Sequence, residues 1–153
     1  DSGVSRDTMA PTISWRRAVS FTESVRTCFG KFATFDGRAT RSEFWWFYLF
    51  VVLVSAVGYV PILLLTILGA SSGDGTVNGA LAFLSVILWI LWIIIVIALY
   101  IPFLAVGCRR LHDRGQSGWL QLLLLVPCGG IVLLVFWVME GTPGDNAYGP
   151  KPA

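Results

Sequence analysis

The sequence predicts an all-α integral membrane protein with a basic amphipathic N-terminal interfacial helix and three transmembrane helices. Only 13% of the 153 residues are charged, about half the share in soluble domains, and 56% are hydrophobic. Three long apolar runs contain no charged residue, and each has about the 20 residues needed to cross a 30 Å hydrocarbon core. This composition excludes an ordinary soluble domain and a disordered chain.

The N-terminal part divides into a flexible segment, residues 1–13, and a cytoplasmic amphipathic helix with a basic motif, residues 14–43. Apolar side chains recur at near-helical spacing between residues 15 and 33, with basic side chains largely off this stripe. This pattern favours a helix at the membrane interface, and packing against the cytoplasmic face of the bundle is the alternative. Ser20 and Glu23 match a capping box, so we expect regular helix to begin at Ser20.

Two features concern the first residues of the chain. Met9 is a candidate natural start, which would make residues 1–8 an upstream extension. We expect no signal peptide, because the first apolar run begins near residue 44 and is too long to be the apolar region of one.

The membrane domain, residues 44–139, is expected to contain spans at about 44–68, 80–106 and 119–139. Pro127, Gly129 and Gly130 interrupt the third run, and Pro removes a backbone hydrogen bond while Gly weakens a helix. We therefore expect the third helix to be kinked or broken at Pro127–Gly130. The alternative is a re-entrant hairpin with legs of about 10–12 Å, too short to cross a bilayer.

The distribution of basic residues predicts the orientation. Seven of the eleven Lys and Arg residues precede residue 44, and three more lie in the second loop, residues 107–118. The first loop, residues 69–79, has none. Because cytoplasmic flanks are enriched in Lys and Arg, we expect a cytoplasmic N-terminus. The turn-rich tail, residues 140–153, would lie outside if the third run spans and inside if it forms a hairpin.

Aromatic side chains support these boundaries. Trp and Tyr gather at the two surfaces of a membrane, where their rings are half immersed. We interpret four such residues near the predicted span ends as interfacial anchors: Trp45, Trp46, Trp119 and Tyr148.

Three motifs carry the family resemblance. They are Phe-Asp-Gly-Arg-Ala-Thr-Arg-Ser-Glu-Phe-Trp at 35–45, Arg-Arg-Leu-His-Asp-Arg-Gly-Gln-Ser-Gly-Trp at 109–119, and Gly-Thr-Pro-Gly-Asp-Asn-Ala-Tyr-Gly-Pro-Lys-Pro at 141–152. Together they resemble the domain-of-unknown-function 805 family, small inner-membrane proteins of bacteria. The resemblance implies a multi-pass protein of the bacterial cytoplasmic (inner) membrane and no established activity.

The charged residues of the first two motifs are expected to gather near the cytoplasmic surface. One interpretation is a site for a phosphate group of a lipid headgroup, a polyprenyl phosphate or a nucleotide. The other is a lattice of ion pairs that fixes the helix ends, and the two are compatible. The candidate cluster consists of Arg38, Arg41, Glu43, Arg109, Arg110, His112, Asp113 and Arg114.

The sequence contains no recognisable catalytic constellation. His112 is the single histidine, and the three cysteines form no C-x-x-C pair, so we expect no metal site and no cofactor. There is no G-x-S-x-G nucleophile motif, and the apolar runs lack the ionisable groups usual in ion-coupled transporters. We also expect no nucleic-acid binding.

We therefore expect a non-enzymatic accessory, assembly or interaction subunit of a larger membrane complex. Its partners would be anionic membrane lipids and either other membrane subunits or further copies of the chain. The alternative is a protein that binds an anionic lipid or polyprenyl phosphate, or an enzyme that acts on one.

Overall fold

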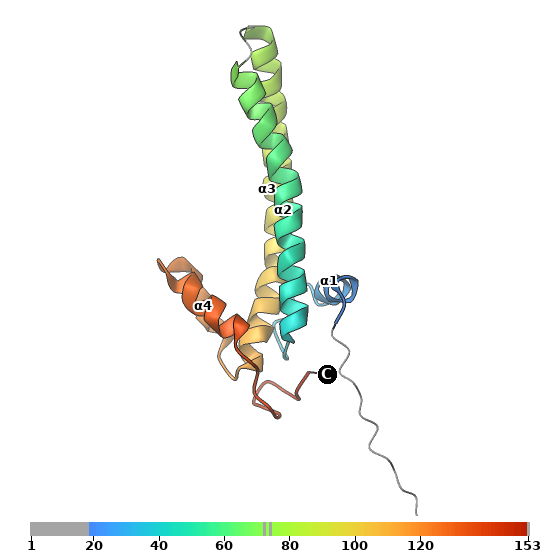
Figure 1. Cartoon of the computed structure of the whole chain (residues 1–153), viewed down its shortest axis with the longest axis vertical. Helices are drawn as coiled ribbons and strands as arrows, with labels where there is room; N and C mark the ends of the chain where they lie inside the picture. The colour runs from blue at the N-terminus through green and yellow to red at the C-terminus, as the bar shows by residue number, and fades with distance from the viewer. Residues whose placement is uncertain (1–18, 72, 74, 153) are drawn as a thin grey trace, which may run out of the picture.

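The computed structural model describes residues 19–71, 73 and 75–152, so the predicted flexible segment 1–13 lies outside the described residues. In this part the order of elements is α1 (Phe21–Gly30), α2 (Arg41–Ser71), α3 (Gly75–Asp113), the 3-10 helix η1 (Gly118–Leu125) and α4 (Gly129–Val138). The long helices α2 and α3 form a hairpin, and the other elements gather at one end of it (Figure 1). We call this end, where α2 begins and α3 ends, the base.

Ser20 forms the N-cap of α1, the first half of the predicted capping box. The Ser20 hydroxyl accepts a hydrogen bond from the backbone N–H of Glu23 at 3.3 Å, and α1 begins at the next residue. The helix ends at Gly30, earlier than predicted, and residues 15–18 of the predicted helix lie outside the described part. Ser24 and Cys28 are buried because α1 packs against α2 and α3. This contact agrees with the alternative in which α1 packs against the bundle. Its place at a membrane surface stays a prediction.

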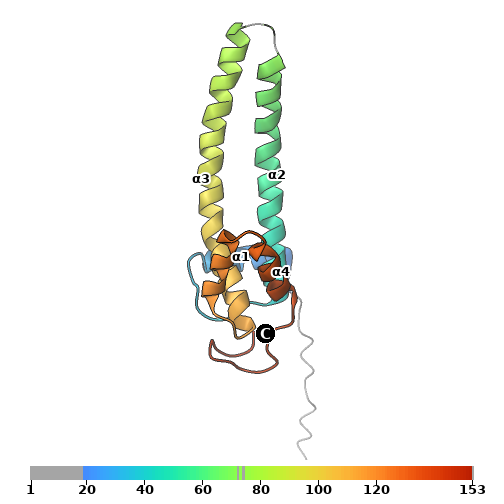
Figure 2. The same ribbon diagram turned by 90° about the vertical axis from the view of Figure 1, so that its left-hand side faces the viewer.

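The hairpin supplies the two helices in the described residues that are long and apolar enough to cross a membrane. They lie side by side along their length (Figure 2). The ring of Trp92 occupies the space where a side chain at Gly58 would lie, so the helices approach closely there. Gly69 packs against Leu81 in the same way. Both helices are longer than predicted, and the connection expected at residues 69–79 is reduced to residues 72–74.

The first part of the second motif, residues 109–113, is helical rather than part of a loop, because α3 continues past its apolar stretch to Asp113. The N–H of Gly115 donates to the carbonyl of His112, and the N–H of Gln116 donates to that of Leu111. Gly115 has a φ of 71°, so this is a Schellman end, in which glycine tolerates the left-handed conformation. The charged residues thus lie on the last turns of a rigid helix.

The third apolar run forms two short helices in a hairpin, η1 and α4, instead of one continuous helix, and its crossing of the membrane stays a prediction. The break predicted near Pro127 is present, because Val126 is extended before the proline and Cys128 turns the chain with a φ of 66°. The turn brings Gly129 against the carbonyl of Leu123, where no side chain fits. The ten residues of α4 are about 15 Å long, half of a hydrocarbon core.

Both ends of the η1–α4 hairpin meet the same part of α3. Gly118, which begins η1, packs directly on the thiol of Cys108. At the end of α4, the indole N–H of Trp137 donates to the carbonyl of Gly107 at 3.3 Å. The run therefore leaves the base and returns to it, and the tail follows at the base (Figure 1).

The hydrophobic core lies at the base and not along the long hairpin. Phe44 and Phe47 of α2 meet Val106 and Leu111 of α3, and the ring of Trp137 in α4 packs at a tilt against Phe44, at a centroid distance of 4.8 Å. This core holds the ends of the elements together and fixes the positions of the charged residues around it.

Candidate functional site

The first motif enters the base through the segment before α2. Gly37 has a φ of 85°, a conformation that favours glycine, and the N–H of Ala39 donates to the carbonyl of Arg109 at 3.1 Å. This fixed backbone places Arg38 in the interior, where its Nε donates to Oδ1 of Asp113 at 2.9 Å. The other two nitrogens of Arg38 donate to tail carbonyls, those of Thr142, Gly144 and Gly149.

Asp113 is shared by two arginines. Arg110, one turn earlier on α3, donates to its other carboxylate oxygen. The Nε of Arg110 also donates to the carbonyl of Trp137 at 3.1 Å, and its Nη2 donates to that of Met139. The arginine–aspartate cluster (Arg38, Arg110 and Asp113) thus connects the first motif, α3, the end of α4 and the tail.

A second buried pair joins α2 to α3. Nη1 of Arg109 lies 2.7 Å from Oε1 of Glu43, and both side chains are almost completely buried. The thiol of Cys28 in α1 lies 3.9 Å from the same carboxylate oxygen. Burial, and then the charge of Glu43, raises the pKa of the Cys28 thiol to about 12, so this thiol stays protonated at neutral pH.

His112 connects the first and third motifs. Its Nδ1 lies 3.2 Å from the carbonyl oxygen of Gly37, and because a carbonyl only accepts, Nδ1 carries the hydrogen. Nε2 faces the thiol of Cys108 at 3.5 Å. The ring of Tyr148 stacks on the imidazole at a centroid distance of 3.9 Å, and Asn146 donates to the carbonyl of His112 at 2.9 Å.

The remaining charged residues of the predicted cluster, exposed Arg41 and half-buried Arg114, form a rim around the base. Arg41 pairs with Glu140 at 2.7 Å, with side chains 50% and 80% exposed. Arg114 donates to the backbone carbonyl of Glu140. Exposed pairs of this kind contribute little to stability, in contrast with the buried pairs beside them.

The eight predicted residues are therefore all at the base, but they fall into separate groups. Sequence reasoning missed the tail residues Thr142 and Asn146, which complete the contacts around Arg38 and His112. It also missed Gly141, because a side chain there would overlap the carboxylate of Asp113. The glycine- and asparagine-rich composition of the tail was the available signal, and it indicated turns but not their docking on α3.

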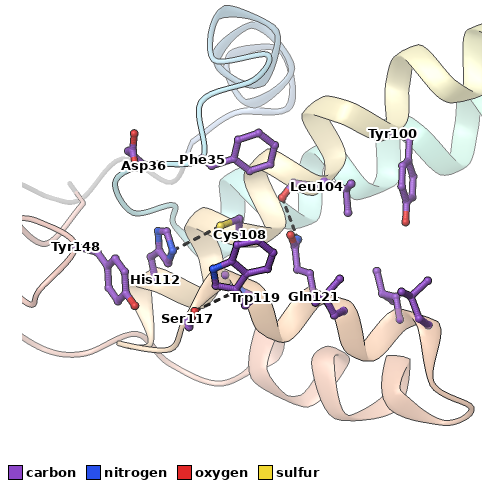
Figure 3. Close-up of a pocket in the computed structure, with 14 residues that line it drawn as sticks. Phe35, Asp36, Tyr100, Leu104, Cys108, His112, Ser117, Trp119, Gln121 and Tyr148 are labelled. Atoms are coloured by element: carbon purple, nitrogen blue, oxygen red, sulfur yellow. Dashed lines mark hydrogen bonds between the residues drawn. The ribbon is translucent and has the colours of Figure 1, made fainter.

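A groove opens beside this cluster, between α3 and η1. Its volume is about 580 Å³, within the usual range of small-ligand sites. Figure 3 shows Phe35 and Trp119 near one end, with His112 and Tyr148 beyond them and Tyr100 at the other end. Of the predicted anchors, Trp119 and Tyr148 line this groove, whereas Trp45 and Trp46 lie on α2.

The geometry offers little support for chemistry at a nucleophile or metal. Cys108 and His112 form the one thiol–imidazole contact given for the described residues, but the backbone of Gly118 covers the sulfur. The described residues contain no group of three or more His, Cys, Asp or Glu side chains arranged to hold a metal ion. What the arrangement does is join three distant motifs into one rigid base.

Known proteins resemble the chain over most of its length. The family described as "Protein of unknown function (DUF805)" matches residues 32–150. Inner membrane protein YhaH of Escherichia coli (strain K12) is 37% identical over 124 residues, covering 77% of this chain and 86% of YhaH. Inner membrane protein YhaI of the same strain is 39% identical over 119 residues, covering 77% of this chain and 85% of YhaI. No solved structure matches the chain.

Proposed function

The chain belongs to the DUF805 family of membrane proteins of unknown function, and from this premise we propose that it is a non-catalytic accessory, assembly or interaction subunit of a membrane complex. Family membership confirms the resemblance that the three motifs indicated. The relatives are inner membrane proteins, and the two long apolar helices agree with that location.

The proposed topology places the base at the cytoplasmic surface. Exposed basic side chains occur at the base, on α1 and the tail as well as on α2, at Arg26, Lys31, Arg41 and Lys151. In the described residues between Ser42 and Cys108 there is no Lys or Arg. In this topology α2 and α3 cross the membrane. The positive-inside rule then places both the N-terminal segment and the tail in the cytoplasm. The η1–α4 hairpin is then re-entrant, because it enters the membrane from the cytoplasmic side and returns to the same side.

The exposure of the long hairpin carries the proposal of an interaction subunit. In each of α2 and α3, only 6% of the most apolar 18-residue stretch is buried within the chain. The side chain of Tyr59, near the middle of α2, is exposed, and its hydroxyl has no hydrogen-bond partner among the described residues. A hydroxyl in the hydrocarbon region is stabilised by a hydrogen bond to a neighbouring helix. The exposed face of α2 therefore fits a transmembrane helix of a partner protein that carries a polar side chain at the same depth.

Photo-crosslinking in membranes tests this proposal. We would place a benzoylphenylalanine at Val57, which is 74% exposed, in the full-length protein. The expected result is a discrete protein adduct that weakens in the Tyr59→Phe variant. Tyr48→Phe is the matched control, because Tyr48 is exposed on the same helix but close to the base. Only lipid adducts, with a monomer in native gels, would contradict the proposal.

A second candidate function is binding of an anionic lipid or polyprenyl phosphate, now centred on the rim. A cavity of about 220 Å³ lies there, and Arg41 and Lys151 line it together with buried Arg110. We expect Arg41→Gln combined with Lys151→Gln to weaken binding to phosphatidylglycerol vesicles without lowering stability. Unchanged vesicle binding would remove this candidate.

A further inference from the structure

The groove between α3 and η1 has a polar end and an apolar end. Asp36, His112 and Ser117 line the end near the base, and Leu104 and Leu122 line the part farther along α3. Trp119 is 79% exposed, so the groove is open at its side. A ligand for this shape has one polar end and one long apolar part.

The length of the groove matches one leaflet of a membrane. Tyr100 and His112 line its two ends, and α3 rises about 18 Å between them. Half of a typical hydrocarbon core is about 15 Å. In the proposed topology the polar end lies at the cytoplasmic surface and the apolar end points into the bilayer. The groove therefore has the dimensions and direction of one lipid acyl chain.

The charge of the polar end indicates which headgroup fits. Asp36 is the one charged residue among the described residues that line the groove, and no described Lys, Arg or His forms an ion pair with it. The aromatic rings of Phe35, Trp119 and Tyr148 line the same end (Figure 3). A carboxylate and aromatic rings at the same end of a groove each attract an ammonium group, the carboxylate through its charge and the rings through cation–π contacts.

We propose that this groove binds a phospholipid whose headgroup carries a primary ammonium, the ethanolamine class. The ammonium lies near Asp36, one acyl chain follows α3 beside Leu104 and Leu122, and the second chain remains in the bilayer. This proposal does not depend on a protein partner, because it concerns a surface separate from the middle of α2.

Native mass spectrometry of the full-length protein in mild detergent tests the proposal. Phosphatidylethanolamine and its N-acetyl derivative with the same acyl chains are titrated separately, because acetylation removes the positive charge. We expect Asp36→Asn to lower the affinity for phosphatidylethanolamine about fivefold, as for a strong exposed ion pair, and to leave the N-acetyl lipid unaffected. Glu23→Gln, an exposed carboxylate outside this groove, is the matched control.

A second variant tests the apolar part of the groove. Leu122 is exposed on η1, so Leu122→Trp fills the groove without disturbing the core and is expected to displace the lipid. Equal binding of the two lipids by the wild type, or equal loss in Asp36→Asn and Glu23→Gln, would overturn the proposal. A change of oligomeric state in Leu122→Trp with lipid binding intact would also overturn it, since the groove would then hold protein.

Discussion

The guanidinium of Arg38 lies 2.8 Å from Oδ1 of Asp113, although 75 positions separate them in the sequence. Their side chains are 1% and 7% exposed, and Arg110 shares the same carboxylate. Three tail carbonyls complete the surroundings of Arg38. This contact therefore brings the three motifs together, and the stability of the base depends on it.

Replacing Asp113 by Asn is expected to destabilise the protein strongly. The change leaves two buried guanidinium groups without their shared counter-charge, and breaking a buried pair in this way costs about 3–5 kcal/mol. The free energy of unfolding in mixed micelles measures the loss. Arg41→Gln removes an exposed pair and is expected to cost less than about 1 kcal/mol. Equal losses in the two variants would show that the buried cluster is not a stabilising centre.

The turn of the η1–α4 hairpin gives a second prediction. A side chain at Gly129 would overlap the carbonyl of Leu123, so Gly129→Ala forces η1 and α4 apart and is expected to cost about 1–3 kcal/mol. Gly130→Ala is the control, because its nearest neighbour, a methyl group of Leu124, lies at an ordinary 3.8 Å. The two unfolding free energies are compared. A destabilised Gly130→Ala beside an unaffected Gly129→Ala would mean that the hairpin is formed differently.

Docking of the tail is tested by another glycine pair. Gly141→Ala would push a methyl group into the carboxylate of Asp113, whereas Gly144→Ala meets open space. We expect faster proteolysis of the tail in Gly141→Ala and wild-type rates in Gly144→Ala. If the tail of both variants resists protease as the wild type does, the tail does not depend on this contact.

The buried thiol of Cys28 predicts a dependence on alkaline pH. Its pKa is raised to about 12 in the folded state from an ordinary value of 9, so the unfolded thiol ionises first. The stability that this group contributes is complete below about pH 9 and is lost as the pH rises towards 12. Cys28→Ala is expected to show a smaller loss of stability between pH 9 and 11 than the wild type. Parallel pH profiles would contradict this explanation.

Much of the fold follows from local patterns in the sequence. Apolar length predicts α2 and α3, and the cap at Ser20 marks the beginning of α1. Pro127 predicts the break in the third run. Each of these features depends on residues close together in the chain, which is why sequence reasoning finds them.

The form of the third run could not be decided in the same way. An apolar stretch of this length suits either a kinked span or a hairpin. The contacts that distinguish them join distant residues, such as Trp137 with Gly107 and Arg110 with Met139. The extent of α3 was missed because polarity changes after Val106 while the helix continues, with its charged residues paired across the base.

The candidate site was predicted in composition but not in arrangement. Sequence reasoning gathered the charged residues in one region, yet it did not separate the buried Arg38 from the exposed Arg41 three residues later. The difference arises from backbone placement, since Gly37 and the hydrogen bond of Ala39 direct Arg38 inwards.

The central claim is that the three motifs meet in one base on one side of the membrane. Locating the tail by cysteine labelling tests this claim most directly. Single cysteines replace Lys31 in the loop after α1, Gly73 at the far end of the hairpin, and Lys151 in the tail, each in a Cys128→Ser background because Cys28 and Cys108 are buried. An impermeant maleimide is applied to intact cells. A re-entrant hairpin predicts labelling at position 73 alone, with positions 31 and 151 labelled only after the cells are opened. Labelling of position 151 together with 73 in intact cells would mean that the third run spans the membrane, and would contradict the joined base.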